Sequence, residues 1–271
     1  MKADEVIIFS DMDGTMLTDW NLGPYVPAVN LEAIKKFISA GGMFSIASGR
    51  QFRETLPFFE GIKFSAPMVQ GNGTVIYDCI SEKILRKIAL PEKVKLECLD
   101  YRKRRTDIWL IAADEYDIYQ VASDDILWDS QLNDKMRKMI SVEEYLSLEL
   151  VKVCYVLADE AALPFISDDV QNFNSANMFR TTQSSPVFLE ILEKSAGKAP
   201  AVAEAVRLAG AEGRRLVCIG DYDNDCDMLA IADIAACPTN SSPSVLEMAS
   251  IITCSNNEGA IADLIRHLDL Y

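Results

Sequence analysis

The stretch Val6-Ile7-Ile8-Phe9-Ser10-Asp11-Met12-Asp13-Gly14-Thr15-Met16-Leu17 sets the architecture of this chain. It opens with four apolar, mostly β-branched or aromatic residues, which predict a buried strand of a parallel sheet. Asp11 and Asp13 follow at the carboxyl end of that strand, where open α/β sheets bind their ligands. Gly14 permits a sharp turn there, so both carboxylates can face one ligand.

Two neighbouring carboxylates repel each other, and a cation offsets that repulsion. Mg²⁺ prefers carboxylate and carbonyl oxygens as ligands. Asp11 and Asp13 therefore favour a magnesium-assisted site, in which one aspartate attacks the substrate and the other moves protons. On this stretch alone, an ordinary polar turn over Asp13-Gly14-Thr15 is an equally good interpretation.

The composition describes a globular protein with a strong negative charge. The chain has 271 residues, of which 49% are hydrophobic, and its formal net charge is −15. That length suits one large domain or two modest ones. The negative charge argues against nucleic acid and anionic membranes as partners, since both attract basic surfaces. An anionic substrate is still compatible with it, because a metal and a few local cations can reverse the sign of the potential inside a cleft.

The cysteines, the single histidine and the amino-terminal residues bear on compartment and catalysis. Seven cysteines are scattered without a Cys-x-x-Cys pair, which predicts free thiols in a reducing cytoplasm. His267 is the only histidine and falls in a predicted helix, so histidine-based catalysis is a poor candidate. No signal peptide or membrane-length apolar run is recognisable. We expect a soluble cytoplasmic protein, either a monomer or a small homo-oligomer.

The first third of the chain alternates strands and helices. The predicted elements are a helix over 30–38 with Asn30 as its N-cap, strands over 43–47 and 67–70, and a hairpin over 74–78 and 83–88. Ser48-Gly49-Arg50 directly follows the second strand of the chain. A hydroxyl and backbone N–H groups at such a strand end can bind phosphate oxygens. A simple helix cap by Ser48 is the structural alternative.

The middle of the chain breaks this alternation. The predicted elements there are helices over 92–105, 134–146 and 160–169, and strands over 108–112, 116–121, 150–157 and 177–182. These strands pair as hairpins or alternate with helices, and none ends in a cluster of catalytic residue types. Residues 88–184 are therefore predicted to be an inserted α+β domain, and residues 1–87 and 185–271 to form the core.

The last third resumes the first pattern. The predicted elements are strands over 187–192, 215–219 and 234–237, and helices over 199–209, 226–232 and 260–268. Lys198 precedes the first of these helices, and Gly220-Asp221-Tyr222-Asp223-Asn224-Asp225 follows a buried strand. Carboxylates at two strand ends, a lysine and a serine hydroxyl suit a metal and a phosphoryl group in one cleft. The fold class predicted is α/β, with a Rossmann-like parallel-sheet core and the inserted α+β domain.

In order and spacing these motifs resemble those of the haloacid dehalogenase superfamily, and within it the Cof-type phosphatases, whose large C2-type α/β cap follows the third core strand. The motifs that carry the resemblance are Asp11-Met12-Asp13-Gly14-Thr15, Ser48-Gly49-Arg50, Lys198, Gly220-Asp221 through Asn224-Asp225, and Asn72-Gly73 before a hairpin. Two segments depart from the pattern. Lys198 lacks the glycine that usually follows it, and Cys237-Pro238-Thr239-Asn240-Ser241 replaces the more usual Met-Gly-Asn-Ala.

The resemblance implies a role for each motif. Asp11 would be the nucleophile that forms an aspartyl-phosphate, and Asp13 would protonate the leaving oxygen and then activate water. Mg²⁺ would bind Asp11, the Asp13 carbonyl oxygen and Asp221. The residues implied to hold the phosphoryl group, through side chain or backbone, are Met12, Ser48, Gly49, Lys198 and Asn224. The residues implied to support the site are Thr15, Arg50, Asn72 and Asp225.

The leading prediction is a magnesium-dependent phosphatase of small phosphorylated metabolites, with sugar phosphates as first candidates. A phosphomutase, which returns the phosphoryl group to a sugar, is the nearest alternative. A receiver-like switch phosphorylated on Asp11 is a non-enzymatic alternative, against which the large insertion argues. Lys194 competes with Lys198 for the lysine role, while Asp223 and Asp227 are interpreted as structural or solvated. The cap residues that could face the cleft are Tyr116, Asp117, Tyr119 and Trp128, although packing or surface positions suit most of them better.

Overall fold

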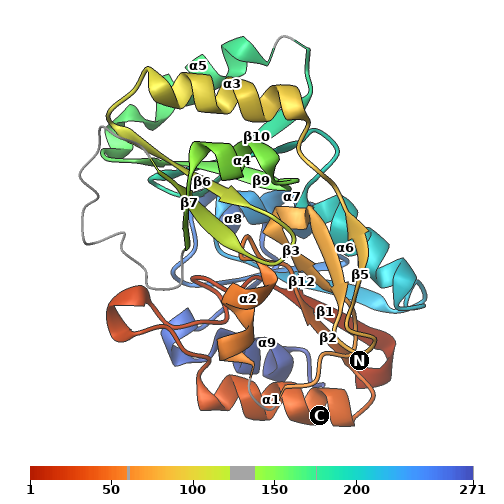
Figure 1. The fold of residues 1–271 in the computed structure, drawn as a ribbon. Helices are drawn as coiled ribbons and strands as arrows, with labels where there is room; N and C mark the ends of the chain where they lie inside the picture. Colours follow the sequence, from red (N-terminus) through yellow and green to blue (C-terminus); the bar gives the residue numbers. More distant parts are fainter. Residues whose placement is uncertain (60–61, 123–137, 175, 271) are drawn as a thin grey trace.

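The computed structural model describes residues 1–59, 62–122, 138–174 and 176–270. It contains one parallel sheet and two largely antiparallel sheets, and the larger of these lies above the parallel one in Figure 1. The predicted α/β core with an inserted α+β unit is confirmed. No described helix is both long and apolar enough to cross a membrane.

The core is a five-stranded parallel sheet in the order β14-β13-β12-β1-β2. Its strands are β1 (Val6–Ser10), β2 (Met43–Ile46), β12 (Arg215–Ile219), β13 (Ile234–Pro238) and β14 (Ile251–Thr253). Strand β1, which lies between β12 and β2, is buried along its whole length, as its apolar sequence predicts. Strand β14 is not among the predicted elements, and it pairs in parallel with β13 beyond the last predicted core strand.

Helices cover both faces of this sheet. Val6 and Ile8 of β1 share a core with α1 (Ala28–Ser39) and α9 (Ala260–His267). Ile7 and Phe9 face the opposite way, because side chains alternate along a strand. The helices on their side are α6 (Lys198–Leu208), α7 (Cys226–Ala230) and α8 (Pro243–Met248).

Asn30 does not cap a helix as predicted. Helix α1 begins at Ala28, after Pro27, so Asn30 lies inside it and is buried. Its side-chain oxygen accepts a hydrogen bond from the Ala262 N–H at 2.9 Å, and its amide nitrogen donates to the Met16 carbonyl oxygen at 3.4 Å. The residue therefore ties α1 to α9, a task that a buried polar side chain can perform when its groups are paired.

A small sheet extends the core beyond β2. It consists of β3 (Met68–Gln70), β4 (Val75–Asp78) and β5 (Lys83–Lys87), preceded in the chain by α2 (Phe52–Thr55). Ala47 pairs in parallel with Val69, which aligns β3 with the edge of the core sheet. The predicted hairpin is confirmed as β4 and β5.

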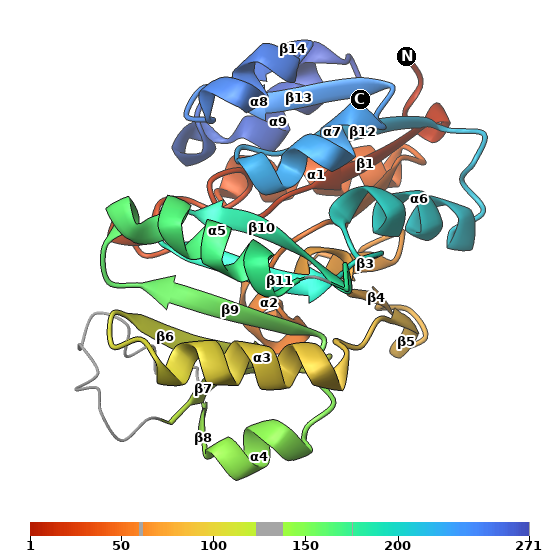
Figure 2. The ribbon, with the colours of Figure 1, turned by 90° about the horizontal axis from the view of Figure 1, so that it is seen from above.

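The second large sheet has six strands in the order β10-β11-β9-β6-β7-β8, all antiparallel except the pair β7–β8. Its strands are β6 (Ile108–Ala113), β7 (Ile118–Val121), β8 (Lys138–Ile140), β9 (Lys152–Leu157), β10 (Phe179–Ser185) and β11 (Phe188–Glu193). Its helices are α3 (Glu92–Lys103), α4 (Val142–Ser147) and α5 (Leu163–Phe173). In Figure 1, α3 and α5 lie on the side of the sheet away from the core, and in Figure 2, seen from above, they lie in front of its strands. We call these elements the cap.

Two element assignments were wrong. The strand over 187–192 was placed in the core, but β11 pairs with β9 and β10 in the cap sheet. We therefore propose that the cap ends near Ser195 instead of residue 184. The helix over 134–146 begins only at Val142, because Ser141 caps it with a hydrogen bond from the Glu144 N–H at 3.1 Å. Lys138–Ile140 is a strand, and residues 134–137 lie outside the described part.

Candidate active site

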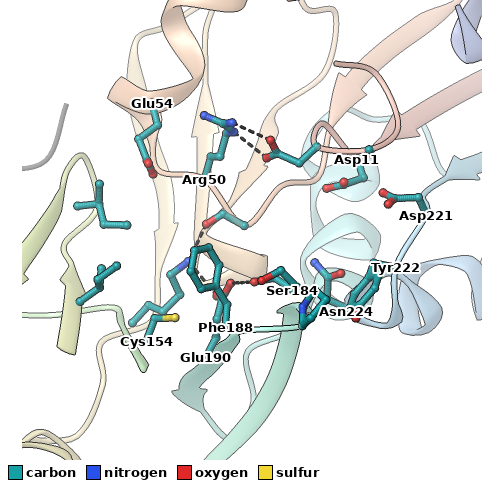
Figure 3. A pocket seen from close by; sticks show the side chains of 18 of the residues that line it. Asp11, Arg50, Glu54, Cys154, Ser184, Phe188, Glu190, Asp221, Tyr222 and Asn224 are labelled. Carbon is teal, nitrogen blue, oxygen red and sulfur yellow. Dashed lines mark hydrogen bonds and ion pairs between the residues drawn. The ribbon is translucent and has the colours of Figure 1, made fainter. Parts of the chain in front are cut away.

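The candidate active site lies where the carboxyl ends of the core strands face the cap sheet. Asp11 follows β1 directly, Ser48 lies two residues after β2, Asp221 lies two residues after β12, and Lys198 is the first residue of α6. Residues of the core and the cap together line a cavity of about 340 Å³ there (Figure 3). The structure thus brings together motifs that are far apart in the sequence.

Three carboxylates meet around one buried ammonium group. Asp11, Asp221 and Asp225 each offer an oxygen within 4.8 Å of the others. The Nζ atom of Lys198 lies 2.6 Å from Asp11 Oδ1 and 2.5 Å from Asp225 Oδ1. Its side chain is fully buried, whereas Lys194 is exposed. Three ionised carboxylates with one ammonium would leave the site two charges short of neutrality.

The pKa values of the site reflect this shortage of positive charge. Burial raises the pKa of Asp11 to about 7, and the charge of Asp225 adds to the effect while Lys198 opposes it. Burial and the charge of Asp11 raise the pKa of Asp221 well above its ordinary value. Burial alone would lower the pKa of Lys198, but Asp11 and Asp225 raise it instead. A hard divalent cation fits this oxygen-rich, electron-rich set.

Asp225 differs from the other two carboxylates because its oxygens are already used by the protein. Oδ2 accepts hydrogen bonds from the N–H groups of Asp221 at 3.0 Å and Tyr222 at 3.3 Å, and Oδ1 binds Lys198. Asp225 therefore shapes the loop and holds the lysine. Asp221 is oriented by Thr15, whose hydroxyl donates to Asp221 Oδ1 at 2.8 Å.

Gly14 allows the first motif to approach Asp221. Its φ is +71°, and a Cβ atom there would lie 2.3 Å from Asp221 Oδ2. The carbonyl oxygen of buried Met12 accepts the N–H groups of Met16 at 2.9 Å and Leu17 at 2.8 Å, which closes the turn. Asn240 supports the same turn, since its amide donates to the Gly14 carbonyl oxygen at 2.8 Å.

The side chain of Asp13 pairs with Arg50 and is not part of the carboxylate cluster. Both its oxygens accept hydrogen bonds from Arg50, from Nε and from a terminal guanidinium nitrogen, each at 2.7 Å. The guanidinium lies 5.0 Å from the ring centres of both Trp20 and Phe58. The Asp13 side chain is 42% exposed and lines the cavity. Its main-chain carbonyl oxygen, not its carboxylate, was the predicted metal ligand.

The second motif forms the wall of the cavity between core and cap. Ser48 is buried, and its Oγ accepts a hydrogen bond from the Arg50 N–H at 3.2 Å. Asn72 has a φ of +54°, and its side-chain oxygen accepts from the Asn224 amide at 3.2 Å. A Cβ atom on Gly49 would lie 3.1 Å from the Asn72 amide nitrogen, so these loops pack tightly.

Two further acidic residues, Asp223 inside the Gly220–Asp225 motif and Asp227 just after it, are engaged elsewhere. Asp223 accepts hydrogen bonds from Ser242 at 3.2 Å and Ser244 at 2.5 Å. Asp227 pairs with Arg180 at 3.5 Å. Both contacts agree with the interpretation of these acids as structural.

The cap residues that line the cavity were missed from the sequence. They are Ile111, Ile118, Lys152, Cys154, Ser184, Ser185, Pro186, Phe188 and Glu190. Most lie on the face of the cap sheet opposite the cap helices. The only signal in the sequence was a charged residue within an apolar strand, as at Lys152 and Glu190. The candidates Tyr116 and Asp117 contact Arg53, Tyr119 donates to Asp114, and Trp128 lies outside the described residues.

Comparisons with known proteins agree with this geometry. The family model of haloacid dehalogenase-like hydrolases matches residues 8–265. A 5-amino-6-(5-phospho-D-ribitylamino)uracil phosphatase of Bacillus subtilis is 24% identical over 98% of this chain and 96% of its own length. A Cof-like hydrolase of Plasmodium vivax superposes with a TM-score of 0.84 at 23% identity, over 97% of this chain and 95% of that one.

A subclass IIB sugar phosphatase superposes with a TM-score of 0.77 at 19% identity, over 98% of this chain and 99% of that one. At that identity the likeness is one of fold, and it extends over both the core and the cap. The match of the family model over nearly the whole chain establishes more. The chain belongs to the haloacid dehalogenase-like hydrolases, in agreement with the resemblance of its motifs.

Proposed function

We propose that this hydrolase is a magnesium-dependent phosphatase of small phosphorylated metabolites, which works through an aspartyl-phosphate on Asp11. The observation that carries the proposal is the position of Asp11. It lies at the end of β1, 2.6 Å from the buried ammonium of Lys198, and faces a cavity closed by the cap. Positioning and charge neutralisation of this kind are what phosphoryl transfer requires.

The two chemical steps use the two aspartates of the first motif. An Asp11 oxygen attacks phosphorus, the bond from phosphorus to the leaving oxygen breaks, and a protonated Asp13 gives its proton to that oxygen. Asp13 then takes a proton from water, which attacks the same phosphorus and releases inorganic phosphate with a free Asp11. Asp13 lines the cavity, and to take this role its carboxyl group would exchange its hydrogen bonds with Arg50 for one with the leaving oxygen.

Further residues hold the phosphoryl group and its charge. The Ser48 hydroxyl, the Met12 and Gly49 backbone, Lys198 and Asn224 are proposed to bind its oxygens. Asp11, Asp221 and the carbonyl oxygen of Asp13 would hold Mg²⁺, which would offset the charge of the phosphoryl group. Thr15 and Asp225 support the proposal by fixing the positions of Asp221 and Lys198.

The cavity favours a leaving group with one apolar face and a polar edge. Ile111, Ile118 and Phe188 supply an apolar wall, while Glu54 and Ser185 supply polar groups. A sugar ring has both kinds of surface, and so has a flat heterocycle. Relatives are named as phosphatases of 5-amino-6-(5-phospho-D-ribitylamino)uracil and of pyridoxal phosphate. We therefore place such phosphates beside sugar phosphates as candidate substrates.

For the compartment and the assembly state we propose what the sequence predicts, a cytoplasmic protein that is a monomer or a small homo-oligomer. All seven cysteines are free thiols, which supports the reducing environment of the cytoplasm.

The test is phosphate release from a panel of sugar phosphates, heterocyclic phosphates and an aryl phosphate. It is run with Mg²⁺, with EDTA, and with Asp11→Asn. We expect metal-dependent turnover that Asp11→Asn abolishes. Asp223→Asn is the matched control, because Asp223 contacts only serine hydroxyls among its described partners and an amide oxygen can still accept from them.

Two outcomes would overturn the proposal in favour of the alternatives. Isomerised substrate without free phosphate would establish a phosphomutase. A stable aspartyl-phosphate on Asp11 without turnover would establish a switch.

A further inference from the structure

A buried ion pair in the cap has no role in the chemistry described so far. Lys152 of β9 and Glu190 of β11 lie 2.8 Å apart, and each side chain is only 5% exposed. Both line the cavity above the phosphoryl site. Withdrawing two charges from water is costly, and a hydrophobic pair would often be at least as stable. The pair therefore calls for an explanation other than cap stability.

Both members of the pair reach across to the core. The Lys152 Nζ donates to the Gly49 carbonyl oxygen at 2.7 Å. Glu190 accepts from the Asn72 amide at 2.8 Å, and Asn72 in turn accepts from Asn224 at 3.2 Å. Within the cap, the Ser184 hydroxyl donates to Glu190, as the dashed line between them in Figure 3 shows. The contacts on the core side thus reach Gly49 directly and Asn224 through Asn72, and both Gly49 and Asn224 are proposed to bind phosphate.

One peptide unit connects Lys152 to the phosphoryl site. In the peptide between Gly49 and Arg50, the carbonyl oxygen accepts a hydrogen bond from the Lys152 ammonium. The N–H of the same peptide donates a hydrogen bond to Ser48 Oγ at 3.2 Å. Because a peptide unit is planar and stiff, fixing its carbonyl also fixes the direction of its N–H. A hydroxyl that accepts this N–H keeps its own hydrogen free to donate.

We propose that Lys152 is a positioning residue, which fixes the Gly49–Arg50 peptide when the cap is closed and thereby directs the Ser48 hydroxyl to the phosphoryl group. Glu190 holds the ammonium in place and positions Asn72 and Asn224 on the other side of the cavity. Because Lys152 and Glu190 both belong to the cap sheet, lifting the cap breaks only their contacts with the core and leaves neither charge unpaired. The site for the phosphoryl group is complete only with the cap closed. This inference rests on the proposed phosphatase function.

A double-mutant cycle between Lys152 and Ser48 tests the connection. Lys152→Met is expected to lower kcat/KM about tenfold, the usual scale for one charged hydrogen bond. If Lys152 acts through Ser48, the same change in a Ser48→Ala background should cost less than about twofold. If Lys152→Met lowers kcat/KM by the same factor with and without Ser48→Ala, the two residues act independently and the proposal is wrong. Lys152→Met with Glu190→Gln removes both charges, so that the cycle can be repeated without an unpaired buried carboxylate.

Arg53→Gln is the matched control. It removes an ion pair between Arg53 of α2 and Asp117 of the cap, at the rim of the same interface but away from the phosphate loops. We expect kcat/KM to change less than about twofold, as for most exposed pairs. A loss equal to that of Lys152→Met would mean that any weakening of the cap–core contact suffices, and would contradict a specific role for Lys152.

Amide hydrogen exchange gives a readout that needs no activity. Lys152→Met should speed exchange of the Arg50 amide in the free protein, whereas Arg53→Gln should not. Unchanged exchange in Lys152→Met would overturn the inference even for an active phosphatase. Absence of phosphate release by the wild-type protein would overturn the proposed function, while the exchange result would still report on the contact.

Discussion

The ionisation of Asp11 governs how acidity affects this protein. Its pKa is raised from the usual 3.8 to about 7 by burial first and then by Asp225. Between these two pH values the folded chain therefore holds a proton that the unfolded chain has released. The contribution of Asp11 to stability therefore falls as pH rises through that window, because the state that binds more protons is favoured at low pH.

We predict that urea unfolding in EDTA gives a lower free energy of unfolding at pH 7 than at pH 4.5. Asp11→Asn has no titratable group at this position, so its stability should change less over the same range. It should also exceed that of the wild type at pH 8, where Lys198 still keeps Asp225 as a partner.

The control is the Asp223→Asn variant, which should follow the wild-type pH dependence. Added Mg²⁺ should reduce the difference between pH 4.5 and pH 7, since a bound cation favours ionised carboxylates. A wild-type stability that stays level across the window would contradict the raised pKa of Asp11.

Two glycines offer a matched pair of substitutions. Gly14 and Gly23 have φ values of +71° and +74°, so alanine is strained at either position by about 1 kcal/mol. A Cβ on Gly14 would lie 2.3 Å from Asp221 Oδ2, whereas one on Gly23 would have no neighbour within 4 Å in the described part of the chain.

We predict that Gly14→Ala raises the Mg²⁺ concentration needed for half-maximal activity at least tenfold, because Asp221 must move. Gly23→Ala should leave that concentration unchanged while losing similar stability from the strained backbone. Equal magnesium dependence in the two variants would show that Asp221 does not hold the metal.

Among the strands and helices, the core was the part best predicted from the sequence. The strands β1, β2 and β12 are short apolar runs, and each is followed by polar residues and glycine, which are typical of a ligand site or a turn. The motifs Asp11-Met12-Asp13 and Ser48-Gly49 could be placed because the carboxyl ends of parallel strands meet at one edge. There the apolar pattern of the strands and the residue types of the loops both indicated the same site.

The misplaced elements share a physical cause. The sequence of β11 suits a strand of the cap sheet as well as a strand of the core sheet, because only the strand that it pairs with distinguishes the two positions. Lys138–Ile140 pairs in parallel with β7, a contact that local propensity does not contain. Cavity residues such as Phe188 and Ile111 were missed for the same reason, because both faces of the cap sheet are apolar.

The contact between α1 and α9 makes a prediction for helix packing. Asn30→Ala leaves the buried Ala262 N–H without its acceptor, and we expect a loss of about 1–3 kcal/mol in the free energy of unfolding. Glu32→Ala, on the exposed face of α1, should change it by less than about 0.5 kcal/mol. Urea denaturation measures both, and equal values would contradict a structural role for Asn30.

At the scale of the whole molecule, contacts between side chains and backbone hold the core and the cap together. Examples are Lys152 with Gly49 and Arg53 with Asp117, and both contacts need the cap to lie against the core. A ligand that touches both parts should increase the closed population. We predict a smaller radius of gyration by small-angle X-ray scattering when Mg²⁺ and orthovanadate are added. Asp11→Asn, which lacks the proposed nucleophile, should show no such change. Identical wild-type scattering with and without the ligand would count against a large cap movement.

The connection from β11 to α6 is short, and only residues 194–197 separate the last cap strand from Lys198. Gly197 in this connection also packs on Gly73, where a Cβ would lie 2.0 Å from the Gly197 carbonyl oxygen. In evolutionary terms, this connection leaves little room for a boundary at which one cap could be exchanged for another. A gene exchange that brought in a new cap has only these four codons between the last cap strand and Lys198, the residue that must stay beside Asp11.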